Sequence, residues 1–276
     1  MIRVKTGMNV SGLAPLGSYE LLEQVGEGAT SVVYRAMDRF GRTVAVKEPR
    51  REVAHDPAVR RRLRREARTM ARVRSPYVAE ALDACLDGER PYLVTEYVAG
   101  VPLRDLVTMY GPLWEEALWG FAGRFAQGVA AVHGAGVLHR DLKPGNVMVV
   151  GGIPKIIDFG IAQETGAEQV TQPGVLTGTP GYVAPELIDG GRCSEASDVF
   201  SWAATVAFAA TGRPPFGAGS LHGICFRVLR GAADLDGVPE RLLLLLRHAL
   251  VRDPAARPAA SWLVDRLTER RPVSAA

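Results

Sequence analysis

The stretch VLHRDLKPGNVMVVGGIPKIIDFG, residues Val137 to Gly160, contains two short apolar runs, NVMVV and IPKII, joined by a Gly-Gly pair. This pattern predicts a β-hairpin. Because a hairpin brings its two ends together, Asn146 at the start of the first strand and Asp158 after the second strand are expected to meet. Asp141 and Lys143 lie on the loop that enters this end of the hairpin. The stretch therefore predicts that two carboxylates, one amide and one ammonium group converge on one point.

These four groups suit phosphoryl transfer. Asp158 and Asn146 offer the oxygen ligands that Mg²⁺ prefers, with Mn²⁺ as an alternative metal. Asp141 can accept the proton of an attacking hydroxyl group, and Lys143 can stabilise the charge of the transferred phosphoryl group. His139 is expected to pack and to form hydrogen bonds rather than to act as a general base.

A second signal lies near the N-terminus, in the stretch VGEGATSVV, where Gly26 and Gly28 precede strand-forming residues. A turn, DRFGR, and another short strand, TVAVK, come next. A dinucleotide-binding fold needs a helix directly after its glycines, and a P-loop needs a Gly-Lys-Ser/Thr ending. Neither follows here, so the glycines are expected at the tip of an antiparallel hairpin, where backbone amides can approach phosphates. Taken alone, the loop could equally be an ordinary turn.

Residues 56–76 predict an amphipathic helix that ends before Pro76, with an apolar stripe formed by Val59, Leu63, Met70 and Val73. Glu66 falls on the same stripe. Because a carboxylate on a buried face needs a cationic partner, Lys47 on the preceding strand is its expected partner. The alternative is that Glu66 lies at the edge of the stripe and reaches solvent. The eight arginines between Arg60 and Arg74 favour a solvated outer face over a docking surface for an acidic partner.

The composition limits the classes of function. A net charge of +3 over 276 residues is too small to indicate a nucleic-acid-binding protein. The three cysteines show no metal-ligand spacing and no disulfide framework, which favours a reducing cytoplasm. The longest apolar run, Val199–Ala210, is too short to span a bilayer and predicts a buried helix. The chain itself is therefore expected to make no membrane contact, although a longer native chain could be tethered to a membrane.

Five motifs occur in a fixed order: VGEGATSVV, VAVK, HRDLKPGN, DFG and GTPGYVAPE. In this respect the sequence resembles the Hanks-type serine/threonine protein kinases, and most of all their actinobacterial members, over residues 19–267. The resemblance implies an α+β, bilobal protein kinase fold. It comprises a tail (1–17), a small antiparallel β-rich N-lobe with one helix (18–98), a larger, mainly helical C-lobe (99–271) and a C-terminal end or linker start (272–276). It also implies transfer of the ATP γ-phosphate to serine and threonine hydroxyls of proteins.

The resemblance further implies roles for individual residues. The catalytic set is Asp141, Lys143, Lys47 and Glu66, with the Lys47–Glu66 pair placing the lysine on the ATP phosphates. The ATP-binding set is Val25, Gly26, Gly28, Val33, Ala45, Lys47, Glu96, Val98 and Met148. Two further contacts are expected to be structural. Glu186 should pair with Arg257, and Asp198 should hold the backbone of the catalytic loop.

Regulation is expected in the segment between DFG and APE. The resemblance implies autophosphorylation chiefly at Thr171, with Thr177 as the alternative site and Arg140 as the acceptor of the phosphate. Thr179 is assigned to the substrate pocket. A homodimer would allow one copy to phosphorylate another.

Two other functions stay open at this point. One is a nucleotide-binding pseudokinase that acts as a scaffold, and the other is a small-molecule kinase of similar fold. The peptide-groove motif GTPGYVAPE speaks against the second.

Overall fold

The computed structural model describes residues 14–159 and 180–269 of the chain. The chain divides into two compact units, Met1–Ala99 and Gly100–Ala276. Each unit contains its own β-sheet. Along the described residues, no helix is both long enough and apolar enough to cross a membrane.

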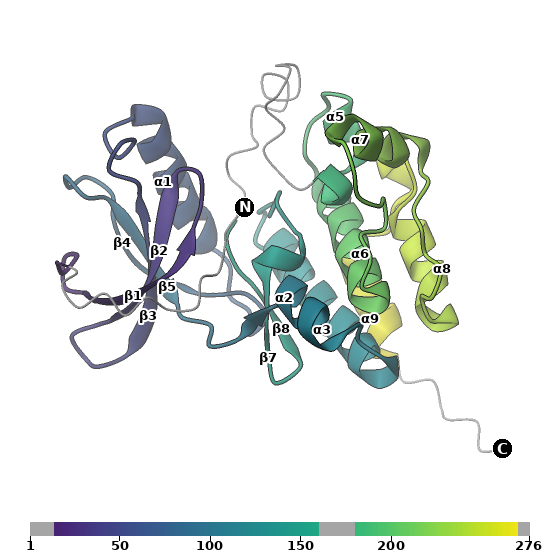
Figure 1. Cartoon of the computed structure of the whole chain (residues 1–276), viewed down its shortest axis with the longest axis horizontal. Helices are drawn as coiled ribbons and strands as arrows, with labels where there is room; N and C mark the ends of the chain where they lie inside the picture. The colour runs from purple at the N-terminus through teal and green to yellow at the C-terminus, as the bar shows by residue number, and fades with distance from the viewer. Residues whose placement is uncertain (1–13, 160–179, 270–276) are drawn as a thin grey trace. The chain divides into compact units, whose positions relative to one another are not determined.

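The first unit is built on a five-stranded antiparallel sheet with the strand order β1-β2-β3-β5-β4 (Figure 1). One helix, α1, packs against β4 and β5. The strands are β1 (Glu20–Glu27), β2 (Ser31–Met37), β3 (Thr43–Pro49), β4 (Ala81–Cys85) and β5 (Tyr92–Glu96).

The glycine-rich stretch forms the hairpin between β1 and β2, as predicted. Gly26 pairs with Val33 across the two antiparallel strands. The N–H of Gly28 closes the turn by donating to the carbonyl oxygen of Ser31 at 2.8 Å. The chain then continues into β3 without a helix, which confirms the distinction drawn from a dinucleotide-binding fold.

The alternation of residues along β3 gives the sheet two different faces. Val44 and Val46 are fully buried and join the core of the unit, together with Val94 of β5. Successive side chains of a strand point to opposite faces. Ala45 and Lys47 therefore belong to the other face.

Helix α1 (Pro57–Met70) begins at Asp56, whose side chain accepts a hydrogen bond from the N–H of Ala58 at 2.7 Å. Such a cap satisfies one of the free N–H groups at a helix N-terminus. The helix ends at Met70, well before Pro76. Its buried residues are Leu63, Glu66, Ala67 and Met70, so Glu66 does lie on the buried face.

The second unit contains a small antiparallel sheet of β6 (Val101–Pro102), β7 (Val147–Val150) and β8 (Ile153–Ile156). Gly151 and Gly152 connect β7 to β8 with φ values of +55° and +79°. A two-residue hairpin turn with positive φ at both positions favours glycine, so the predicted hairpin is confirmed. One detail differs. Asn146 does not open β7 but ends a 3₁₀ turn, Pro144–Asn146, because its N–H bonds back to the carbonyl oxygen of Lys143.

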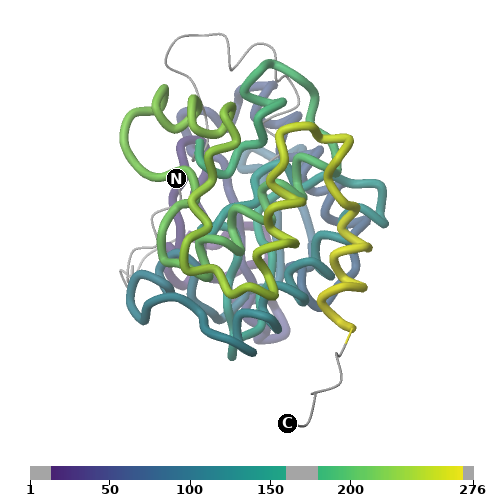
Figure 2. The backbone as a smooth tube through the Cα atoms, turned by 90° about the vertical axis from the view of Figure 1, so that its right-hand side faces the viewer, coloured from purple at the N-terminus to yellow at the C-terminus, as the bar shows by residue number. Residues whose placement is uncertain are grey.

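The other elements described in the second unit are helices and 3₁₀ turns. The apolar run of the sequence lies in α6, whose residues from Ser197 to Ala210 are all buried, as predicted. Helix α3 packs against α9 and α6, and α6 packs against α8 (Figure 2). The helices are α2 (Leu103–Tyr110), α3 (Glu115–Gly134), α5 (Pro185–Ile188), α6 (Glu195–Thr211), α7 (Leu221–Arg230), α8 (Glu240–Ala249) and α9 (Ala260–Thr268), with 3₁₀ turns at Pro180–Tyr182 and Pro254–Ala256.

Candidate active site

Lys47 and Glu66 form an ion pair inside the first unit. The Nζ atom of Lys47 lies 2.6 Å from Oε1 of Glu66, and the two side chains are 18% and 6% exposed. Lys47 comes from β3 and Glu66 from α1, which packs beside the sheet. The predicted contact is therefore confirmed. The buried carboxylate restricts the lysine to a narrow range of positions.

The sheet face that carries Lys47 also carries other residues of the predicted nucleotide site. Val33 lies directly opposite Lys47 on the neighbouring strand β2. Ala45, two residues before Lys47 on β3, lies opposite Thr95 of β5. Val25 falls at the irregularity in the β1–β2 register, next to the paired Gly26. The first unit thus places small and aliphatic side chains around one ammonium group.

The residues after β5 present backbone groups. Glu96 ends β5 and pairs with Val44 in the sheet. Its backbone N–H donates to the carbonyl oxygen of Glu80 at 2.8 Å. Val98 has a buried side chain, and its backbone N–H and C=O form no hydrogen bond with any described residue. Backbone groups left unpaired in this way are available to the polar edge of a nucleobase.

Three side chains meet in the second unit at the entrance to the β7–β8 hairpin. Oδ2 of Asp141 accepts hydrogen bonds from Nζ of Lys143 at 2.6 Å and from Nδ2 of Asn146 at 2.8 Å. Nδ2 of Asn146 also donates to the backbone carbonyl oxygen of Asp141 at 2.8 Å. The carboxylate of Asp141 is thereby held in one orientation, and the predicted convergence of these groups is observed.

Asp158 follows β8 and lies next to this cluster. The N–H of Ile157 donates to the backbone carbonyl oxygen of Asn146 at 3.0 Å, so the ends of the hairpin meet as predicted. Asp158 has φ of +54°, and Arg140 has φ of +70°. Non-glycine residues seldom adopt such values, and those that do cluster at functional sites. The structure thus adds local backbone strain at Arg140, next to Asp141, and at Asp158, which the sequence did not indicate.

Asp198, at the start of α6, anchors the loop that carries Asp141. Its Oδ2 accepts from the N–H of His139, and its Oδ1 accepts from the N–H of Arg140, both at 2.8 Å. The expected contact with the loop backbone is confirmed. Sequence reasoning missed His133, a buried histidine near the end of α3 whose Nε2 lies 3.0 Å from Oδ2 of Asp198. The sequence could have indicated this contact, because His133 falls on the buried face of a long helix, where a histidine needs a polar partner.

His139 has the structural role that was expected. Its Nε2 lies 3.2 Å from the carbonyl oxygen of Ile157, and its Nδ1 accepts from the N–H of Asp141 at 3.3 Å. Its ring also packs on Phe159, with 4.8 Å between the ring centroids. Burial lowers the pKa of His139, although nearby Asp198 acts in the opposite direction. The neutral ring therefore connects the catalytic loop to the end of the hairpin.

Glu186 of α5 and Arg257 form the other predicted structural pair. The two guanidinium Nη atoms donate to the two carboxylate oxygens at 2.8 and 2.7 Å. Ser197 of α6 donates a further hydrogen bond to Glu186 at 2.7 Å. Three segments of the second unit are joined at this point.

The donor set near the hairpin fits a magnesium ion. Because Nδ2 of Asn146 is occupied by Asp141, Oδ1 is the amide atom left to act as a ligand. Asp158 would supply the carboxylate. Within the described residues no group of three or more His, Cys, Asp and Glu side chains could hold a metal. Mg²⁺ commonly uses one or two carboxylates of the protein and completes its shell with substrate phosphates and water.

Three predicted residues, Thr171, Thr177 and Thr179, lie outside the described residues. Met148 lies on β7, opposite Pro102 of β6 and Lys155 of β8.

The family model described as "protein kinase domain" matches residues 19–266. The chain belongs to the protein kinase family. Among solved structures, the kinase fold of this chain is similar to that of Rad53 residues 1–466 in complex with AMP-PNP. The TM-score is 0.76 and the identity 26%, over 90% of this chain and 64% of that one.

Curated members of the family from actinobacteria are similar over most of this kinase domain. Serine/threonine-protein kinase AfsK of Streptomyces coelicolor is 38% identical over 244 residues, which are 88% of this chain and 30% of AfsK. The probable serine/threonine-protein kinase PkwA of Thermomonospora curvata is 36% identical, over 92% of this chain and 34% of PkwA. Serine/threonine-protein kinase PknL of Mycobacterium tuberculosis is 36% identical over 87% of this chain and 62% of PknL. The chain therefore spans about a third of the length of AfsK and PkwA.

Proposed function

We propose that this kinase domain transfers the γ-phosphate of ATP to serine and threonine hydroxyls of proteins. The observation that carries the proposal is the carboxylate of Asp141, oriented by Lys143 and Asn146 at the end of the β7–β8 hairpin. The names of AfsK, PkwA and PknL support a protein as acceptor and serine or threonine as the phosphorylated residue. The AMP-PNP complex of Rad53 supports ATP as the nucleotide.

In the first unit, the groups around Lys47 bind the nucleotide. The ammonium group of Lys47 contacts the phosphates, and Glu66 keeps it in place through the 2.6 Å contact. Gly26 and Gly28 allow backbone amides to approach the phosphates without interference from a Cβ atom. Val33 and Ala45 contact the adenine ring, and backbone groups of Glu96 and Val98 recognise its edge.

In the second unit, the cluster around Asp141 acts on the attacking hydroxyl. The carboxylate accepts the hydroxyl proton as the oxygen bonds to the γ-phosphorus, and the bond from that phosphorus to the β–γ bridging oxygen breaks to release ADP. Lys143 stabilises the negative charge on the transferred group. Asn146 and Asp158 would hold Mg²⁺, which neutralises phosphate charge when bound.

The scaffold alternative receives no support. A pseudokinase is expected to have lost groups that the reaction needs, whereas Lys47, Asp141 and Asp158 are all present. The relatives named above are kinases by name. Regulation by phosphorylation of Thr171, with Thr177 as the alternative site, remains part of the proposal, as does a transient homodimer in which one copy phosphorylates another.

The test is phosphorylation of generic protein substrates by the purified chain with radiolabelled ATP and Mg²⁺, followed by phosphoamino-acid analysis. Wild-type protein should label serine and threonine. Asp141→Asn should lower the rate about 100-fold or more while nucleotide affinity stays unchanged. Asp265→Asn, an exposed carboxylate of α9, is the matched control and should behave as wild type. Nucleotide binding by the wild type without any transfer would favour the scaffold, and near-full activity of Asp141→Asn would refute the catalytic assignment.

A further inference from the structure

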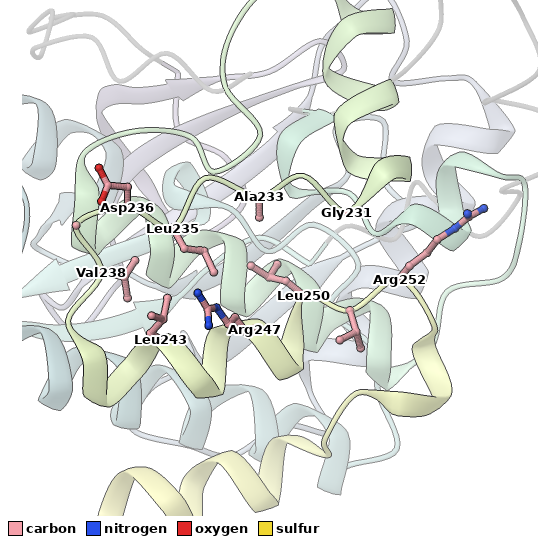
Figure 3. Close-up of a pocket in the computed structure, with 11 residues that line it drawn as sticks. Gly231, Ala233, Leu235, Asp236, Val238, Leu243, Arg247, Leu250 and Arg252 are labelled. Carbon is pink, nitrogen blue, oxygen red and sulfur yellow. The ribbon is translucent and has the colours of Figure 1, made fainter.

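A groove runs along helix α8 in the second unit, between this helix and the loop at residues 231–238 (Figure 3). Its volume is about 670 Å³. None of its residues belongs to the candidate active site. We call it the α8 groove; it is lined by Gly231, Ala233, Leu235, Asp236, Gly237, Val238, Leu243, Arg247, Leu250, Val251 and Arg252.

One wall of the α8 groove is held in place by hydrogen bonds. The N–H of Asp234 donates to the carbonyl oxygen of Pro215 at 2.7 Å. The guanidinium of Arg213 donates to the carbonyl oxygen of Asp236 at 2.8 Å and to the carboxylate of Asp234 at 3.3 Å. A preformed wall lowers the entropy that a ligand loses on binding. The groove is therefore ready for an occupant without rearrangement of the loop.

The opposite wall is a helix with more leucine than its packing requires. Of the run Leu242–Leu246, Leu242, Leu245 and Leu246 are buried in the core. Leu243 is partly exposed and lines the groove, whereas Leu244 is 63% exposed and does not line it. Leu243 and the buried Leu250 give this wall of the groove an apolar surface.

A cation lies in the middle of this apolar wall. Leu243, Arg247 and Leu250 are spaced four and three residues apart, so they share one side of the helix. In Figure 3 the guanidinium of Arg247 lies between the two leucines and faces Leu235 of the loop. Arg247 is exposed, and its side chain forms no salt bridge or hydrogen bond with any other described residue. A carboxylate on an apolar ligand would complement it.

The ends of the groove differ in charge. Asp236 lies at the end where α8 begins, and Arg252 lies beyond the end of the helix (Figure 3). Arg252 is only loosely paired, at 3.5 Å from Asp189. The complementary ligand carries negative charge opposite Arg247 and toward Arg252.

The length and openness of the groove favour an extended chain. Helix α8 has 10 residues and is thus about 15 Å long. An extended peptide of about four or five residues covers this length. The groove is partly open to solvent, whereas compact small ligands are mostly enclosed by their sites. We propose that the α8 groove binds a short extended segment of a partner protein, in which Asp or Glu stands beside aliphatic or aromatic side chains.

The inference concerns binding alone and does not depend on phosphoryl transfer. The probe is a phage-displayed library of random heptapeptides, selected in parallel on the whole wild-type chain, on Arg247→Glu and on Arg124→Glu. Arg124 is an exposed arginine of α3 that does not line the groove. An enriched peptide is then synthesised with a fluorescein label, and its Kd is measured by fluorescence anisotropy. Tryptophan fluorescence in urea checks that each variant is folded.

The wild type and Arg124→Glu should select the same acidic and apolar peptides. Arg247→Glu should weaken their binding about tenfold or more, because it replaces a charge-assisted contact with repulsion. Higher ionic strength should weaken binding to the wild type.

Three results would overturn the proposal. Selection could yield no peptides that depend on Arg247, or it could yield basic peptides. Calorimetry could instead show that sodium decanoate binds through Arg247 when no peptide does, which would make the groove a site for a small amphiphile.

Discussion

Replacing Arg257 by lysine should destabilise the second unit strongly, although the charge is retained. All five N–H groups of the Arg257 guanidinium donate to an acceptor, in hydrogen bonds that are partly buried. Two bonds reach the Glu186 carboxylate at 2.8 and 2.7 Å. Three others reach the backbone carbonyl oxygens of Val251, Ala196 and Arg252, each at 2.9 Å. The guanidinium side chain itself is 0% exposed.

The magnitude follows from the acceptors that lysine cannot reach. An ammonium group carries three N–H groups on one atom, so at least two of the five acceptors lose their partner. A buried acceptor left unpaired costs about 1–3 kcal/mol, and these acceptors are partly buried, so two of them should lower the free energy of unfolding of Arg257→Lys by about 2–3 kcal/mol. Arg257→Met also leaves the Glu186 carboxylate without its cation and should cost about 3–5 kcal/mol.

Tryptophan fluorescence in urea measures the free energy of unfolding of the second unit. All four tryptophans lie in the second unit: Trp114, Trp119, Trp202 and Trp262. The matched control is Arg266→Lys, because the Arg266 side chain is 52% exposed, pairs with Glu269 at the surface and otherwise lies over the ring of Trp262. The control should change the free energy of unfolding by less than about 0.5 kcal/mol. An equally small change in Arg257→Lys would refute the argument that the hydrogen bonds of the planar guanidinium, rather than its charge, stabilise the contact between Arg257 and Glu186.

Four further predictions concern charge, nucleotide, metal and regulation. Burial alone would raise the pKa of Glu186, but hydrogen bonds from Arg257 and Ser197 lower it below its ordinary 4.5. The stability that the ionised Glu186 contributes above pH 4.5 should therefore be lost as the pH falls below 4.5. Urea midpoints measured over this pH range should fall less in Glu186→Gln than in the wild type. Lys47→Met should remove most phosphoryl transfer in the radiolabelled ATP assay yet leave the urea transition of the second unit unchanged. Asp158→Ala should weaken binding of Mg-ATP more than that of metal-free ATP in calorimetry; equal losses would contradict its role as a metal ligand. Thr171→Ala and Arg140→Ala should each reduce activity, with the double variant little worse than either, whereas additive losses would show that the two residues act separately.

Local sequence patterns predicted the hairpins correctly. Two adjacent glycines between short apolar runs predicted the β7–β8 turn, and both glycines have positive φ. The hairpin in turn brought Asn146 and Asp158 together, because antiparallel strands joined by a tight turn must end side by side. The spacing of the α1 stripe placed Glu66 on a buried face, and the need to compensate its charge identified Lys47. Each of these inferences used only local sequence patterns and the rule that a buried charge needs a partner of opposite charge.

Resemblance to the kinase family was needed for contacts between distant segments. It implied the Glu186–Arg257 pair and the role of Asp198, which no periodicity indicates. Even then the detail was incomplete. The family motifs named Arg257 as the partner of one carboxylate, whereas the structure shows that three backbone carbonyls share it.

The sequence by itself determined the β-hairpins, the buried face of α1, the buried helix α6 and the group of residues at the end of the β7–β8 hairpin. Only the tertiary structure revealed that His133 of α3 contacts Asp198 of α6, 65 residues away. Only it showed that Arg247 faces Leu235 across a groove, in the loop that precedes α8. The physical reason is the range of the interactions involved. Periodicity and turn chemistry act over a few residues, whereas these contacts depend on how whole helices and loops pack, and packing is decided by the combined burial of many side chains.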